Sequence, residues 1–125
     1  MANAPPALLG TWKIAPTDRA DLERTLAAAR KAEDEDAVRE LVPAVALWKR
    51  LELQIEPMEI VGDLGDGLDS RRYAVKDQWT SGEGMLIVDL ELLGPGGPRP
   101  VSVMFTAPNK VMFQGQDLRL PLQRA

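Results

Sequence analysis

Three side chains in one stretch, Tyr73, Asp77 and Trp79, have the types and spacing of a small-molecule site. A carboxylate between two aromatic rings can anchor a polar group of a ligand while the rings form apolar walls. The segment that holds them, residues 72–80, alternates with the period of two that is typical of a β-strand. Alternate residues of a strand share one face, so the three side chains are predicted to point the same way.

The strand is predicted to continue as a β-hairpin through residue 93, because a glycine-containing turn is followed by a second alternating apolar run. A two-residue loop in the turn would place Trp79 opposite Leu86 and Val75 opposite Leu90. That register puts the apolar side chains of both strands on a single face, which an antiparallel sheet can bury.

The same register places Asp77 opposite Val88, on the apolar face. A buried carboxylate costs several kcal/mol unless it is paired or reaches water. One interpretation is a polar anchor inside a ligand cavity. The alternative is structural: the sheet opens to solvent at this point, or Asp77 caps a neighbouring backbone group.

Two other stretches contain residues that could bind ions. Asp63, Asp66 and Asp69 alternate with glycines and could offer oxygens to Ca²⁺, but their spacing of three differs from that of an EF-hand loop. A turn-rich loop is the favoured interpretation. The glycines in residues 94–97 lie between two predicted strands, so no helix N-terminus follows to bind phosphate. No metal site and no cofactor are predicted.

The sequence contains no histidine and no cysteine, which excludes thiol nucleophiles, thiolate zinc sites and disulfides within it. It also lacks the usual general base near neutral pH and the commonest metal ligand. An enzyme built from this chain would need paired carboxylates, or a tyrosine or lysine with a displaced pKa. No such constellation is identifiable, so the chain is predicted not to be an enzyme.

The net charge of −4 argues against general attraction to nucleic acid or to anionic lipid. No apolar run is long enough to span a membrane, and the first residues show no basic region followed by an apolar stretch, so no secretory leader is expected. Neither a nucleic acid nor a membrane is expected as a partner. The compartment stays unassigned: this sequence favours the cytoplasm, and export would require that a leader had been removed.

Residues 1–125 are predicted to form a single domain that begins with a flexible lead-in over residues 1–7. A short strand at residues 10–14 is followed by a helical insertion over residues 17–50. Pro43 interrupts the second helical pattern, which predicts either a kink or the start of a fresh helix there.

The strand meander is predicted to occupy residues 51–123, in about six strands separated by glycine- and proline-rich turns. The apolar phase slips by one residue at Pro57, which predicts a β-bulge. Pro121 limits the last strand to a sheet edge or to a position that donates no hydrogen bond. The predicted class is α+β, mainly β, with an antiparallel meander that forms a barrel or a strongly curved sheet. The alternative is an open curved sheet with a helix in its concave face, as in cystatin-like or NTF2-like domains.

The run Gly10-Thr11-Trp12 in the first strand resembles the GxW signature of lipocalin-like (calycin) barrels, and the wider layout is similar to small lipocalin-like domains of uncharacterised bacterial proteins. The resemblance implies that Trp12 closes one end of a barrel and stacks on a basic side chain of the last strand. Arg119 and Arg124 are the two candidates. It also implies an interior that Trp12 would line.

Together these patterns predict a binding module whose ligand-binding residues are Trp12, Tyr73, Asp77 and Trp79. The expected ligand is a small apolar molecule held between the sheet and the helices. The alternative is a structural or protein-interaction domain with a solid core and no small-molecule site. In that case an apolar patch near Met85 and Ile87 would meet a protein partner or a second copy in a homodimer.

Overall fold

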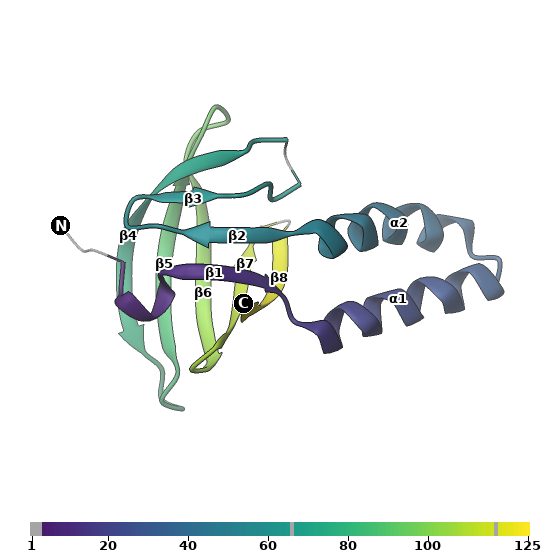
Figure 1. The fold of residues 1–125 in the computed structure, drawn as a ribbon, viewed down its shortest axis with the longest axis horizontal. Helices are drawn as coiled ribbons and strands as arrows, with labels where there is room; N and C mark the ends of the chain where they lie inside the picture. Colours follow the sequence, from purple (N-terminus) through teal and green to yellow (C-terminus); the bar gives the residue numbers. More distant parts are fainter. Residues whose placement is uncertain (1–3, 66, 117) are drawn as a thin grey trace.

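The computed structural model describes residues 4–65, 67–116 and 118–125, and its strands close into one barrel (Figure 1). A 3-10 turn, η1 (Pro6–Leu8), precedes the first strand, β1 (Gly10–Ile14), and two helices follow it, α1 (Pro16–Lys31) and α2 (Glu35–Arg50). The other strands, in order around the barrel, are β2 (Glu52–Ile55), β3 (Glu59–Val61), β4 (Ser70–Thr80), β5 (Leu86–Leu93), β6 (Arg99–Ala107), β7 (Lys110–Gly115) and β8 (Leu118–Arg124). The predicted α+β, mainly β class and the helical insertion after the first strand are confirmed.

The barrel closes because β1 pairs antiparallel with both β2 and β8. Trp12 faces Leu53 on one side and Arg124 on the other. Pro121 in β8 lies opposite Met112 of β7, and its carbonyl accepts a hydrogen bond from the Ala15 N–H at 2.9 Å. The proline therefore occupies a ladder position that needs no donor, and not a sheet edge.

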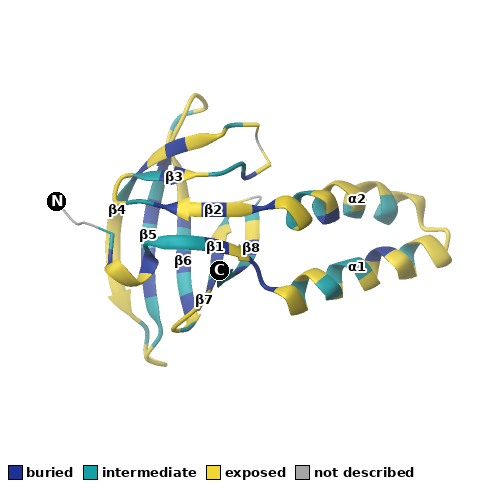
Figure 2. Ribbon diagram, viewed as in Figure 1, coloured by how far each residue is buried: buried dark blue, intermediate teal, exposed yellow. Residues whose placement is uncertain are grey.

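Side chains fill the interior of the barrel, as expected for a small eight-stranded barrel. Alternate residues of every strand point inward and form one apolar cluster that contains both Trp12 and Tyr73. Figure 2 shows this as buried bands across the strands. The largest fully buried side chains are Trp12, Phe113, Leu8, Leu53, Ile55, Ile60, Leu90, Leu120, Leu122, Val88 and Val103.

The two helices form an antiparallel hairpin that projects away from the barrel (Figure 1). Leu26 is the buried residue of α1 and Val45 is the buried residue of α2. Asp34 begins α2 by accepting the Ala37 N–H at 3.2 Å, which satisfies an orphan donor of the first turn. None of the described helices has the length and apolar character needed to cross a membrane.

Pro43 lies inside one continuous α2, so the predicted fresh helix at this residue is wrong. The cost of the lost backbone hydrogen bond is outweighed because α2 docks its apolar stripe on α1. A second correction concerns Pro57. Glu56 donates its N–H to Glu59 across a turn at 2.8 Å, and β2 and β3 are separate antiparallel strands. The phase slip marks a reversal of the chain and not a bulge.

The β4–β5 register differs from the prediction at the end that holds Asp77 and Trp79. Val75 faces Leu90 as predicted, but Asp77 faces Asp89 and Trp79 faces Ile87. The loop contains one more residue than predicted, because the Ser81 N–H bonds to the Met85 carbonyl at 2.9 Å and Gly84 takes a positive φ of 84°. A bulge between Val75 and Asp77 then restores the original register for the rest of the ladder.

Candidate functional site

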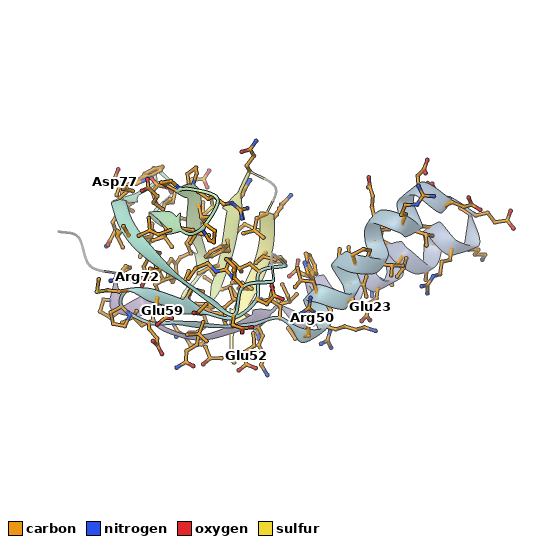
Figure 3. All side chains as sticks on the ribbon, turned by 90° about the horizontal axis from the view of Figure 1, so that it is seen from above. Glu23, Arg50, Glu52, Glu59, Arg72 and Asp77 are labelled. Carbon is orange, nitrogen blue, oxygen red and sulfur yellow. The ribbon has the colours of Figure 1, made fainter. Side chains whose placement is uncertain are left out.

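The four predicted ligand-binding residues do not meet in one cavity. Trp12 and Tyr73 are buried inside the barrel, at 0% and 4% exposure. Asp77 is exposed and Trp79 is 45% exposed on the outside of the wall. The bulge turns Asp77 and Trp79 to the face opposite that of Tyr73. Figure 3 shows Asp77 on the side of the barrel remote from the helical hairpin.

Trp12 closes one end of the barrel. Its Nε1–H donates to the Leu8 carbonyl at 2.9 Å, and its ring meets Phe105 edge-on with centroids 6.3 Å apart. The guanidinium of Arg124 lies 4.5 Å from the ring centroid, a cation–π contact. Arg124, one of the two arginines expected from the family resemblance, thus supplies the stack, and Arg119 is exposed.

Arg124 also fastens the N-terminal segment across this end of the barrel. Its Nη1 donates to the Leu9 carbonyl at 2.8 Å, its Nη2 donates to the Ala7 carbonyl, and its Nε lies 3.3 Å from Asn109 Oδ1. One side chain therefore joins β8, the segment around η1 and the β6–β7 turn. The N-terminal segment is therefore held across this end of the barrel.

Replacing Arg124 by methionine should lower the free energy of unfolding by about 1–3 kcal/mol, because a hydrogen-bonded cation is lost and the carbonyls of Ala7 and Leu9 lose their donor. Urea unfolding followed by circular dichroism measures the change. Arg119→Met, on the same strand but exposed, is the matched control and should stay within about 0.5 kcal/mol of the wild type. Equal effects of the two variants would contradict the assigned role of Arg124.

Tyr73 has a structural position on the inner side of β4. Its hydroxyl donates to the Glu56 carbonyl in the turn between β2 and β3, and burial raises the pKa of Tyr73. The hydroxyl proton of Tyr73 is thus already used in a hydrogen bond to the backbone. The packed ring belongs to the same apolar cluster as Trp12.

Outside the wall, the residues around Trp79 form a second group, which we call the Trp79 face: Asp77, Trp79, Ile87, Asp89, Ser102 and Met104. The Trp79 Nε1–H donates to Asp89 Oδ2 at 3.2 Å, and the Ser102 hydroxyl donates to Asp89 Oδ1 at 2.5 Å. The face borders a shallow hollow of about 690 Å³ over β4–β7. Sequence reasoning missed Asp89, although an acid that follows three consecutive apolar residues of a strand is a usable signal.

A smaller cavity of about 270 Å³ lies at the rim of the barrel between the start of β4, the end of β5 and the glycine-rich loop that follows. Leu68, Leu92 and Leu93 form apolar walls, and Arg71 and Arg99 add positive charge. Arg71 is 6% exposed, and its Nη2 donates to the Gly62 and Leu68 carbonyls, each at 3.0 Å. The described lining of this rim cavity includes no residue of α1 or α2.

Asp63 organises the loop between β3 and β4, as the turn interpretation predicts. Its Oδ1 accepts the Gly65 N–H at 2.7 Å and the Gly67 N–H at 3.2 Å, while Arg50 of α2 reaches Oδ2 at 3.3 Å. Asp66, the second acid of the considered Ca²⁺ set, lies outside the described residues. Among the described residues, no group of three or more acids suited to a metal ion is found.

The hydrogen bonds from Gly65 and Gly67, followed by the nearby Arg50, lower the pKa of Asp63 below its ordinary value of 3.8. Ionised Asp63 therefore stabilises the fold above that value, and the stabilisation disappears as the pH falls through the lower folded-state pKa. Asp63→Asn should be less stable than the wild type at neutral pH, with a difference that shrinks as the pH falls below the ordinary value of 3.8. Urea midpoints across that range test this. A difference that does not change with pH would assign the effect to geometry and not to charge.

Comparison of the chain with protein-family models, curated proteins and solved structures finds no match.

Proposed function

We propose that this chain is a non-enzymatic protein-interaction domain, in which a lipocalin-like barrel with a filled core serves as scaffold and the outer surface binds a protein partner. The filled interior is the observation that supports this function most directly: the inward side chains from β1 to β8 pack against one another, and Trp12 and Tyr73 belong to that packing. A barrel whose interior is occupied by its own side chains leaves its outer surface for recognition.

The lipocalin-like assignment, including the small bacterial domains that the sequence resembles, is part of the proposal. It is supported by the eight-stranded antiparallel closure and by the contact between Trp12 and Arg124. The surface offers two features for recognition: the helical hairpin that projects from the barrel, and the Trp79 face on the remote side (Figures 1 and 3). Exposed large apolar side chains occur on both, with Val42 at 40% and Trp79 at 45%.

Site-specific photo-crosslinking in the native cell tests the proposal. A photoreactive side chain is introduced separately at Val42 on α2, Met58 in the β2–β3 turn, Leu93 at the rim and Met104 on the Trp79 face. We expect one position, and not all four, to give a discrete crosslinked product. A product of twice the chain mass would identify a homodimer. Absence of any discrete product, with each variant folded and expressed, would refute the function.

A second candidate, binding of a small apolar molecule, is favoured by the rim cavity. Its leucine walls could hold part of an acyl chain, with Arg99 at the edge for a polar head. Titration with an environment-sensitive apolar dye and with fatty acids should then give saturable binding that Leu93→Arg abolishes and Trp79→Ala leaves unchanged. Lack of saturable binding to the wild type would eliminate this candidate.

A further inference from the structure

We propose that the Trp79 face binds a basic segment of the protein partner, with an arginine or lysine side chain stacked on the Trp79 indole and its cation held by Asp89 and Asp77. The inference rests on the proposed function and assigns it a surface and a partner chemistry. Three observations support it: the way Trp79 is fixed, the uncompensated acids beside it, and the shape and composition of the hollow.

Trp79 is held along the neighbouring strand and remains partly exposed. Its ladder partner Ile87 also points outward yet is only 6% exposed, lying between Trp79 on one side and Met104 on the other. The indole N–H, which lies in the plane of the ring, reaches Asp89 two residues further along β5. The hydrogen bond uses the edge of the ring, and the residue as a whole remains 45% exposed to solvent. A fixed and partly exposed indole is the preferred aromatic platform for a cation.

The acids beside Trp79 are not neutralised within the described chain. Asp77 and Asp89 lie directly opposite each other on β4 and β5, an arrangement in which like charges repel. Asp89 accepts hydrogen bonds from Trp79 and Ser102, and Asp77 accepts one from the Gln78 N–H at 2.8 Å, but neither forms an ion pair with a described residue. The nearby Lys76 is already paired with Glu91 at 3.6 Å. A partner's cation would relieve this repulsion.

The hollow next to these acids suits a peptide segment better than a small molecule. It is wide and shallow, at about 690 Å³, and its floor combines Trp79 and Met104 with polar side chains such as Ser102 and Gln114. A peptide segment with a basic residue next to an apolar one would suit this surface. Its cation would lie against the two acids, and its apolar side chain would pack near Met104. The same acids disfavour phosphate groups, which argues against a nucleic acid on this face.

An NMR titration of the full chain tests the inference through its three tryptophan indole N–H signals. The probe is a short peptide of alternating arginine and leucine with blocked termini, and its control is the same peptide with the neutral analogue citrulline in place of arginine. We expect a saturable shift of the Trp79 signal with the arginine peptide, while the signals of Trp12 and Trp48 stay in place. The shift should weaken as salt is added. No saturable shift, or an equal shift with citrulline, would overturn the inference.

Variants separate charge from stacking. Asp89→Asn keeps an acceptor for Trp79 but removes the charge, and should weaken binding at least about threefold. Trp79→Leu should weaken binding about tenfold, measured by calorimetry because its indole signal is lost. Asp36→Asn, on the helical hairpin, is the matched control and should leave binding unchanged. Equal binding to wild type, Asp89→Asn and Trp79→Leu would place the peptide elsewhere and overturn the inference.

The crosslinking positions distinguish failure of this inference from failure of the proposed function. A protein crosslinked through Met104 and lost in Asp89→Asn supports both. A protein crosslinked only through Val42 on α2 would support the proposed function and overturn the assignment of the Trp79 face. Equal affinity of the arginine peptide and of the polyamine spermidine would also overturn it, because the face would then recognise charge without stacking and apolar contact.

Discussion

Replacing Trp12 by alanine should lower the free energy of unfolding by about 3–5 kcal/mol, the range for removing a large buried aromatic side chain. Trp12 is fully buried, touches Phe105 edge-on and donates to the Leu8 carbonyl. The substitution would also leave Arg124 without the ring on which it stacks. Urea unfolding followed by circular dichroism gives the change, and thermal unfolding checks whether the variant still folds.

Trp79→Ala is the matched control because it removes the same side chain from the outside of the same barrel. Because the residue is already 45% exposed to water, we expect Trp79→Ala to lower the free energy of unfolding by about 1 kcal/mol. The free energy of unfolding of Trp12→Phe should lie between that of the wild type and that of Trp12→Ala, since an aromatic ring remains to contact Arg124 and Phe105. A Trp12→Ala loss no larger than that of Trp79→Ala would contradict the closed end described for the barrel.

Gly62→Ala is the second substitution for which we expect a large effect, about 2–4 kcal/mol of stability. Gly62 has a φ of 136°, which side-chain-bearing residues rarely adopt. An added Cβ would also lie 2.4 Å from the Glu52 carbonyl oxygen and 2.8 Å from Leu53 Cδ2. Because the Gly62 carbonyl accepts from Arg71, a displaced Gly62 would disturb the barrel rim as well.

Gly84→Ala separates the two contributions to this effect. Gly84 also has a positive φ, 84°, but an added Cβ there would meet nothing within 4 Å. We expect Gly84→Ala to lower the free energy of unfolding by about 1 kcal/mol, because only the backbone conformation disfavours the substitution. The difference between the two variants in urea unfolding then measures the steric term at Gly62. If Gly62→Ala cost no more than Gly84→Ala, the close approach of β3 to β2 would be incorrect.

Part of the candidate site could be predicted from local sequence patterns, and part depends on the exact pairing of the strands. The pairing of Val75 with Leu90 was predictable because both follow a strong period-two pattern. The outward turn of Asp77 and Trp79 was not, because it depends on one extra loop residue and on a compensating bulge. Each shifts the register by a single residue, and a single residue is enough to move a side chain to the opposite face.

The sequence by itself determined the class of the fold, the position of the helical insertion and the buried face of the strands that pair without a bulge. These follow from local periodicity, turn residues and the burial of apolar side chains, all of which act over a few residues. Only the tertiary structure decided that α2 continues through Pro43, that Arg124 reaches Trp12 and that Trp79 lies outside beside Asp89. The Arg124–Trp12 contact joins the two ends of the chain, and the packing of α2 on α1 outweighs the local preference of Pro43. The position of Trp79 depends on the exact loop length and on the bulge in β4, which a periodic pattern does not specify.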